Sequence, residues 1–316
     1  MRHTFQDLTR KGQPLAFYCK GLLRQLVPLP LAKRQQEALL KRAEQHKDRA
    51  EIEWRVAYYH KLAQPFDASA APRIVNIERK KSRYFLDLDA HSKGFGPDRR
   101  LHYLFGDICH VPDAPTVVKS RPVKGNNENS ILLKLDQLRH FNWTPDPIPF
   151  RDKKPSAVWR GTPLTEERRQ LVRMFYHHPT FDIGHSRHAV DDLSPKSSLS
   201  HGEQKTHKFF ISLEGNDVAT NLKWGMASNM LVFAPMPEYE TWFMEGLLEP
   251  GKHFVELKSD CSDLEDKVAY YSDHPDEAEQ IIANAHAWVA MFFDPLKERI
   301  ISTLVLQKYF SLSGQL

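Results

Sequence analysis

The chain has 316 residues, enough for two domains of ordinary size, and its 41% hydrophobic and 27% charged residues are typical of a globular protein. No apolar run approaches the ~20 residues of a membrane-spanning helix, and residues 1–13 lack the apolar core of a secretory signal, so a cytoplasmic protein is expected. Three widely spaced cysteines without a CxxC pair argue against a zinc knuckle or a disulfide framework.

The net charge of +4 is unevenly distributed along the chain. Residues 1–61 contain 13 Lys and Arg against 6 Asp and Glu, whereas the remainder is slightly acidic. Such a basic segment fits an anionic partner, namely lipid headgroups, a phosphorylated saccharide or nucleic acid, or it forms an ordinary solvated helix face. No RNA-binding signature and no DNA-reading motif accompanies the charge, so nucleic acid is not an expected partner.

The residue pattern in the first half of the chain predicts a helix near its start and short strands after it. Spaced apolar residues among many charges predict a helix over 31–62, after two prolines. Strands are expected at 84–88, 102–105, 116–119 and, as a strand or short helix, 130–135. Residues 124–129 form a loop by composition. The stretch 143–155 contains four prolines and is interpreted as the linker between two domains, 1–150 and 151–316.

Strands and helices alternate through the second half, which predicts a doubly wound α/β domain. Strands are expected at 157–159, 181–184 and 253–257, helices at 166–176, 239–248, 264–271, 276–293 and 296–310, and a polar mobile loop at 191–204. Residues 206–235 show an apolar run, Glu214-Gly215, helical spacing and a second apolar run, the order of a βαβ unit. Such a unit places a helix N-terminus at the carboxyl edge of a parallel sheet, where phosphates bind. A nucleotide or nucleotide sugar is therefore the expected ligand.

Polar residues lie at the expected strand ends of this second half. Arg160, Gly161 and Thr162 follow a strand, where an arginine can bind a diphosphate and a glycine admits it closely; an ordinary surface turn is the alternative. Further polar or basic residues are Arg168, Lys208, Asn221 and Lys223. Lys223 could neutralise a departing nucleotide diphosphate in place of a metal ion, or it could be a solvated helix lysine.

Metal ligands and a general base are less clearly indicated. Asp87 and Asp89 have the spacing of a metal-binding pair but lie outside the expected nucleotide domain, and four histidines within 177–188 fit no standard zinc spacing. No metal site is therefore expected. Asp107, and after it Asp113, are the candidates for the base that deprotonates a sugar hydroxyl, although each could equally cap a turn.

A series of sequence blocks in a fixed order resembles glycosyltransferase family 90. The blocks are WRG at 159–161, TPLTEER at 162–168, HKFFISLEG at 207–215, a helix with Lys223, MLVF at 230–233, Glu238, and HFVELKSDCSDLED at 253–266. That family contains bacterial lipopolysaccharide core glycosyltransferases, fungal capsule-associated xylosyltransferases and animal protein O-glucosyltransferases. The bacterial branch is the most similar, because YLFGDICHVPDAPTVVKSRPV and NSILLKLDQLRHF also resemble it.

The resemblance implies an α/β fold of the GT-B type, with two Rossmann-like domains facing each other across a cleft and helical segments at both ends of the chain. It implies that the second domain binds the donor, and that transfer is inverting and metal-independent. The matching donor-site positions are Arg160, Gly161, Thr162, Arg168, Lys208, Gly215, Asn221, Lys223, Glu238 and Asp260. Animal members have an arginine at the position of Asn221, and their catalytic aspartate corresponds to Pro122. The resemblance therefore leaves the base unassigned.

The activity that the resemblance implies is transfer of a hexose, either glucose or galactose, to a lipopolysaccharide core. The donor would be UDP-glucose or UDP-galactose, without any cofactor. The site of action would be the inner face of the cytoplasmic membrane, with peripheral membrane contact. The basic N-terminal segment would hold either the phosphorylated, lipid-linked acceptor or the membrane surface. A protein or capsular acceptor is one alternative, and a catalytically inactive sugar-nucleotide-binding protein is another. The sugar, the linkage and the oligomeric state are not specified by the residues.

Overall fold

The computed structural model describes residues 2–316, with side chains described from Pro14 onward. The chain divides into two units. The first unit takes the chain up to His140 together with Phe292–Leu316, and the second unit is Phe141–Met291. The C-terminal helix thus belongs with the first part of the chain, and the domain boundary at residue 150 stays a prediction.

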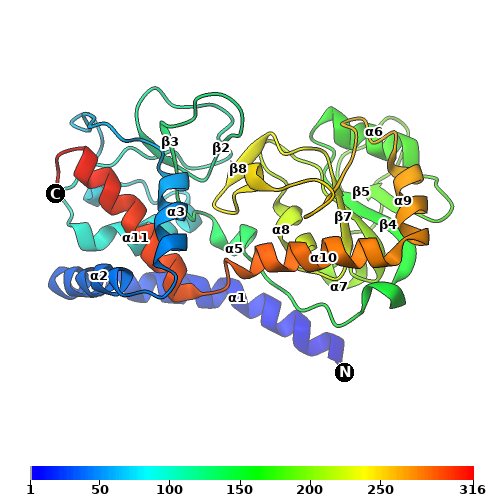
Figure 1. Cartoon of the computed structure of the whole chain (residues 1–316), viewed down its shortest axis with the longest axis horizontal. Helices are drawn as coiled ribbons and strands as arrows, with labels where there is room; N and C mark the ends of the chain where they lie inside the picture. The colour runs from blue at the N-terminus through cyan, green and yellow to red at the C-terminus, as the bar shows by residue number, and fades with distance from the viewer. Residues whose placement is uncertain (1) are drawn as a thin grey trace. The chain divides into compact units, whose positions relative to one another are not determined.

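One parallel sheet of five strands forms the centre of the second unit (Figure 1). Its strands, in spatial order, are β5 Asp182–His185, β4 Lys154–Gly161, β6 His207–Ile211, β7 Leu231–Ala234 and β9 Val255–Glu256. When only the strands of this sheet are numbered along the chain, this is the order 2-1-3-4-5 of doubly wound α/β folds. The expectation of a mixed α/β protein with a parallel sheet is therefore confirmed.

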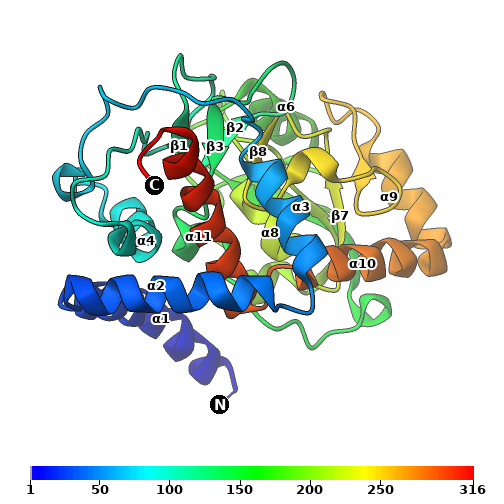
Figure 2. The ribbon, with the colours of Figure 1, turned by 60° about the vertical axis from the view of Figure 1, so that its left-hand side comes forward.

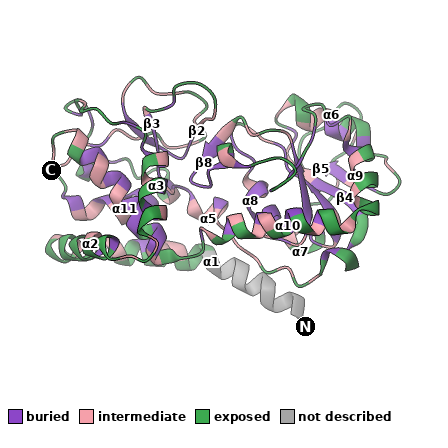
Figure 3. Cartoon of the chain, viewed as in Figure 1, coloured by how far each residue is buried: buried purple, intermediate pink, exposed green. Residues whose placement is uncertain are grey.

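Helices on this sheet bury its strands (Figure 3). The helices of the unit are α6 Glu166–Phe175, α7 His201–Gln204, α8 Thr220–Met226, α9 Leu264–Asp273 and α10 Pro275–Ala290, with the short 3₁₀ helices η3 Phe150–Asp152 and η4 Glu245–Leu247 and the strand β8 Tyr239–Thr241. Helix α6 contacts β5, α9 contacts β4, and α8 and α10 contact β7. Phe209, Phe210 and Ile211 are consecutive and fully buried, as in a strand covered on both faces.

The first unit is mainly helical. Its helices are α1 Arg2–Gln25, α2 Leu29–Glu44, α3 Arg49–Tyr59, α4 Ser82–Ser92, α5 Gln137–His140 and α11 Pro295–Leu312, with 3₁₀ helices η1 Ile74–Asn76 and η2 Lys93–Phe95. Its strands are β1 Thr116–Val118, β2 Ser120–Pro122 and β3 Ser130–Leu132. Strands β1 and β3 pair in parallel, and α11 packs against α2, α3 and α4 (Figure 2). Because each described strand here has three residues, a Rossmann-like first domain is not confirmed.

Several predicted elements are wrong. Residues 84–88 belong to helix α4, because a short buried apolar run fits a helix as well as a strand. Residues 102–105 form a single bridge, Tyr103 to Val117. Residues 239–248 form β8 and η4, separated by Met244 in a left-handed conformation with φ of 58°, which a helix cannot contain. The helix expected over 31–62 is divided into α2 and α3.

Candidate functional site

The carboxyl ends of β4 and β6 form the switch point of the sheet. The chain leaves β4 toward β5 on one side, and it leaves β6 toward β7 on the other. Open parallel sheets bind ligands at this edge, outside the carboxyl ends of the strands. Strand β4 ends at Gly161 and β6 at Ile211, so the segments that follow them line the edge.

Arg168 joins these two segments. It lies in the first turn of α6, whose N-cap Thr165 accepts a hydrogen bond from the Arg168 backbone. Its Nη1 donates to the carbonyl oxygen of Thr162 at 3.1 Å, and its Nη2 to that of Leu213 at 2.7 Å. Burial lowers the pKa of the guanidinium, and the charge of Glu214 opposes that shift.

The charge of Arg168 is not matched by a carboxylate at hydrogen-bond distance. Within the part of the chain that the structure describes, the guanidinium of Arg168 is bonded to backbone carbonyl oxygens and to no carboxylate, and its buried Nε has no hydrogen-bond partner. Gly215 keeps the adjacent segment close, because a Cβ there would lie 3.1 Å from Nη2 of Arg168. Thr162, Arg168 and Gly215, all predicted donor residues, are therefore brought together around one cation.

The other predicted glycine has a packing explanation. Gly161 is the last residue of β4 and does not lie in the predicted turn after the strand. A Cβ at this position would lie 2.7 Å from the indole ring of Trp159, which is buried in the core. The absence of a side chain at 161 therefore accommodates that ring.

Glu214, which was not selected from the sequence, lies beside Arg168. Its carboxylate accepts the backbone N–H groups of Glu238 and Tyr239, both at 3.3 Å, and so joins the segment after β6 to the segment after β7. Burial raises the pKa of Glu214 to about 8, assisted by the charges of Glu245 and Glu238 and opposed by the two N–H donors. The carboxyl group is therefore mostly protonated at pH 7 and can itself donate a hydrogen bond. Its position directly after a strand was the available sequence signal.

Asn221 is tied to the end of β6. Its Oδ1 accepts a hydrogen bond from Oγ of Ser212 at 3.0 Å, and its Nδ2 donates to the carbonyl oxygen of Ile211 at 3.3 Å. The helix that carries it, α8, has seven residues. A helix this short has a weak dipole at its N-terminus, so binding of a phosphate must depend more on side chains.

Lys223 is fully buried, so its interpretation as a solvated lysine is wrong. Its Nζ lies 2.5 Å from Oε1 of Glu245. The same carboxylate accepts hydrogen bonds from the backbone N–H and the hydroxyl of Thr241. The ammonium also lies 5.5 Å from the centre of the Phe243 ring. Lys223 therefore faces a carboxylate in this structure, and its contact with a diphosphate stays a prediction.

Arg160 points away from the switch point. Its Nη2 lies 2.6 Å from Oδ1 of Asp182, and its Nε donates to the carbonyl oxygen of Ser197 at 2.9 Å. Asp182 is the register partner of Val158, two residues earlier in β4. The guanidinium therefore extends back along the strand, and a diphosphate contact would require it to leave this ion pair.

Two further predicted residues lie outside the cluster around Arg168. Lys208 is the second residue of β6, toward the amino end of the strand, with its Nζ over the ring of Phe150. Asp260 is exposed beyond β9 and accepts the backbone N–H of Ser262 at 3.0 Å, a hydrogen bond that lowers its pKa. Glu238 reaches the cluster through its backbone N–H to Glu214.

The two base candidates occupy different surroundings in the first unit. Asp107 Oδ1 lies 2.5 Å from Nζ of Lys119 and 3.3 Å from Nη2 of Arg139. Asp107 also lines a cavity of about 450 Å³ whose other lining residues are Lys80, Lys81, Ser82, Arg83, Tyr84 and Gly106. Asp113 is exposed and does not line this cavity, and its carbonyl oxygen accepts a hydrogen bond from Asn129 at 3.0 Å. Of the two, Asp107 is the carboxylate in a hollow that could hold a substrate.

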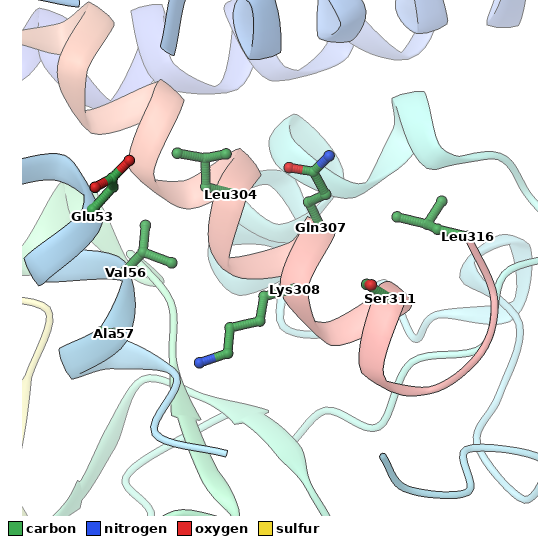
Figure 4. A pocket seen from close by; sticks show the side chains of 8 residues that line it. All are labelled: Glu53, Val56, Ala57, Leu304, Gln307, Lys308, Ser311 and Leu316. Carbon is green, nitrogen blue, oxygen red and sulfur yellow. The ribbon is translucent and has the colours of Figure 1, made fainter. Parts of the chain in front are cut away.

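A second cavity, of about 600 Å³, lies against α3 and α11 in the first unit (Figure 4). Its lining residues are Glu53, Val56, Ala57, Leu304, Gln307, Lys308, Ser311 and Leu316. Lys308 donates to the carbonyl oxygen of His60 at 2.6 Å. No nucleophile and base are paired in this lining, so the cavity is not a candidate for catalysis. Over the described residues, no group of three potential metal ligands occurs.

Comparison with known proteins finds a matching family model and relatives that align with different shares of this chain. The model of Glycosyl transferase family 90 matches residues 135–309. O-glucosyltransferase LpsA of Dichelobacter nodosus is 43% identical over 309 residues, which are 96% of this chain and 97% of that protein. Protein O-glucosyltransferase 3 of Homo sapiens is 27% identical over 165 residues, 50% of this chain and 32% of that protein. Every predicted donor residue lies within the matched segment, whereas Asp107 and Asp113 precede it.

Proposed function

The chain belongs to glycosyl transferase family 90, and we propose that it transfers glucose from UDP-glucose to a saccharide acceptor. Support for glucose comes from the name of the relative in Dichelobacter nodosus, which aligns with 96% of this chain. UDP-galactose is the alternative donor. The proposed reaction needs no metal ion and inverts the configuration at the anomeric carbon.

The surroundings of Arg168 support binding of a nucleotide diphosphate by the second unit. The guanidinium of this arginine lies at the switch point without a carboxylate partner among the described residues, and a diphosphate would supply the missing negative charge. As the bond between the sugar and the diphosphate breaks, charge grows on the leaving oxygen, and a fixed cation stabilises it. The protonated carboxyl of Glu214 can donate a hydrogen bond to the same ligand.

The acceptor hydroxyl is the proposed nucleophile. Its oxygen attacks the anomeric carbon in line with the departing UDP, and its proton passes to a carboxylate of the first unit. Asp107 is the proposed base, because it lines a cavity and Asp113 does not. The proposal includes a GT-B arrangement, in which the first unit presents the acceptor to the donor bound by the second.

A lipopolysaccharide core at the inner face of the cytoplasmic membrane is the proposed acceptor. It is the acceptor of the family branch that the chain resembles most, and the basic start of the chain fits a phosphorylated, lipid-linked saccharide. The similarity to a human protein O-glucosyltransferase favours a protein acceptor instead, but it covers half of this chain. In the described part of the chain, no helix combines the length and apolarity that a bilayer crossing requires.

Substitution of Arg168 tests the donor site. Arg168→Gln is expected to lower kcat/KM for UDP-glucose by about 100-fold or more, the usual cost of removing one group that stabilises a leaving charge. Arg168→Lys should retain part of the activity. The matched control is Arg169→Gln, because this neighbouring arginine forms an exposed ion pair with Glu166 and should leave kcat/KM within about threefold. Equal activity of both glutamine variants, with unchanged melting temperatures, would contradict the proposal.

Ligand-dependent melting identifies the donor, and product analysis identifies the acceptor. With EDTA present, UDP and UDP-glucose should raise the melting temperature, and UDP-galactose should do so less. Glucose should then be incorporated into deacylated lipopolysaccharide core and not into a protein substrate. No shift with any uridine nucleotide would refute the donor assignment. Transfer to the protein substrate alone would refute the acceptor.

A further inference from the structure

The outward face of α1 carries a stripe of leucines. Leu15 and Leu22 in α1, and Leu26 in the turn that follows it, are 68%, 59% and 77% exposed. A helix turns by roughly 100° per residue, so Leu15 and Leu22, spaced by seven, lie on one side of it. The backbone N–H of Leu26 donates to the carbonyl oxygen of Leu23 at 3.1 Å, which keeps Leu26 wound against the end of the helix. Leu23, next to Leu22 in α1, is 66% exposed, and Leu31, in the first turn of α2, is 45% exposed. An exposed apolar surface of this kind marks a contact with something other than water.

The opposite face of α1 is fixed to the rest of the first unit. Gly21 lies so close to α4 that a Cβ would be 2.8 Å from Cδ1 of Leu86. Arg24 donates to the carbonyl oxygen of Leu86 at 3.3 Å. Nζ of Lys93 donates to the carbonyl oxygens of Arg24 and Gln25 at 3.0 and 2.8 Å. These contacts fix the rotation of the helix and keep the leucine stripe outward.

Charge decides what can cover this stripe. Residues 8–36 contain six Lys and Arg and no Asp or Glu. Lys20, Lys33 and Arg34 are exposed, and the basic surface continues along α2 with exposed Lys41. Two copies of such a face would repel each other, because both are positive. An anionic bilayer attracts the cations through its headgroups and accepts the leucines among its acyl chains.

We propose that the leucine stripe of α1, flanked by the basic residues of α1 and α2, docks the protein on an anionic lipid bilayer. Helix α1 lies in the plane of the surface, with its leucines at the boundary between headgroups and acyl chains. The choice of a membrane rests on the proposed function, which places the acceptor on a lipid. The contact itself is measured without sugar transfer, so either proposal can fail while the other stands.

Vesicle binding by the full chain tests the proposal. The protein should sediment with vesicles of phosphatidylcholine and phosphatidylglycerol, less with phosphatidylcholine alone, and less at high salt, because salt screens surface charges. The variant Leu15→Ser, Leu22→Ser, Leu26→Ser should bind the anionic vesicles about tenfold more weakly or worse. Its melting temperature should not fall, because all three side chains are exposed.

The matched control replaces three exposed apolar residues away from α1, in the variant Val75→Ser, Leu104→Ser, Met174→Ser. It should bind vesicles like the unmodified protein. Transfer to a deacylated, water-soluble acceptor should be the same in both triple variants. Failure of the unmodified protein to bind anionic vesicles would overturn the proposal, as would equal binding by the two variants. Concentration-dependent dimers that only the α1 variant abolishes would assign the stripe to a second copy instead.

Discussion

The two units of the chain pair their buried charges over different separations in the sequence. In the second unit, the buried ion pairs Lys223–Glu245 and Lys153–Asp146 join segments that are near each other in the chain. In the first unit, the fully buried Arg55 pairs with Glu298 on the C-terminal helix. A buried charge is tolerated only when its partner is in place. The first unit therefore depends more on contacts between remote parts of the chain.

Glu298 illustrates this dependence. It lies on α11, and its Oε1 is 2.7 Å from Nη2 of Arg55 on α3. Its Oε2 is 2.7 Å from Nζ of Lys134. A buried ion pair contributes little net stability while intact, because both charges lose their hydration, but removal of one partner leaves an unpaired charge inside. The pairing thus makes the first unit depend on its C-terminal helix.

Removal of Glu298 is expected to have the largest effect on stability. Glu298→Ala should lower the free energy of unfolding by about 3–5 kcal/mol, because Arg55 and Lys134 lose a buried partner. Urea denaturation measures the change, and limited proteolysis should show cleavage of the first unit before the second. A loss below about 1 kcal/mol would mean that charge pairing does not hold this unit together.

In the second unit, Gly161→Ala tests apolar packing. The added Cβ would lie 2.7 Å from the indole of Trp159, so the ring must shift, at a cost of about 1–3 kcal/mol. The control is Gly202→Ala in α7, where the nearest atom is 3.8 Å away, and this change should be neutral or slightly stabilising. Thermal unfolding compares the two variants. Equal melting temperatures would show that the core around Trp159 adapts freely.

A pH-dependent effect is expected at Glu214. Its pKa is about 8 in the folded protein, against an ordinary value of 4.5. Between these values the folded state keeps a proton that the unfolded state has released, so stability falls as the pH rises. Glu214→Gln cannot titrate. It should melt a few degrees above the unmodified protein at pH 9, and this advantage should be lost as the pH falls toward 4. An advantage independent of pH would exclude titration as its cause.

The smallest effect is expected at the surface of the first unit. Arg49 and Glu53 form an ion pair at 2.6 Å, and both side chains are 60% exposed. Glu53→Ala should leave the urea midpoint of unfolding almost unchanged, because water and salt screen exposed charges. Compared with Glu298→Ala under the same conditions, it separates the effect of burial from that of charge pairing. A loss equal to that of Glu298→Ala would remove this distinction.

The local residue pattern predicted the structure of a segment correctly where the strands that pair are close to each other in the sequence. The βαβ unit of residues 206–235 was predicted because its two apolar runs pair directly as β6 and β7. The local pattern was insufficient for residues 84–88, which could form a strand or a helix. In the folded chain these residues belong to helix α4. Asp87 in this helix is buried and accepts a hydrogen bond from the backbone N–H of Gln137, fifty residues later.

The family, the parallel α/β character of the second unit and the segments that follow its strands were predictable from the residues alone, because each depends on residue order and short-range pattern. The direction of each side chain in those segments, in contrast, follows from the folded chain. Arg168 lies across the switch point, whereas Arg160 pairs with Asp182 and Lys223 with Glu245. The folded chain also places Glu214 where burial raises its pKa. Partners and burial come from segments distant in the chain, and no spacing within one segment encodes them.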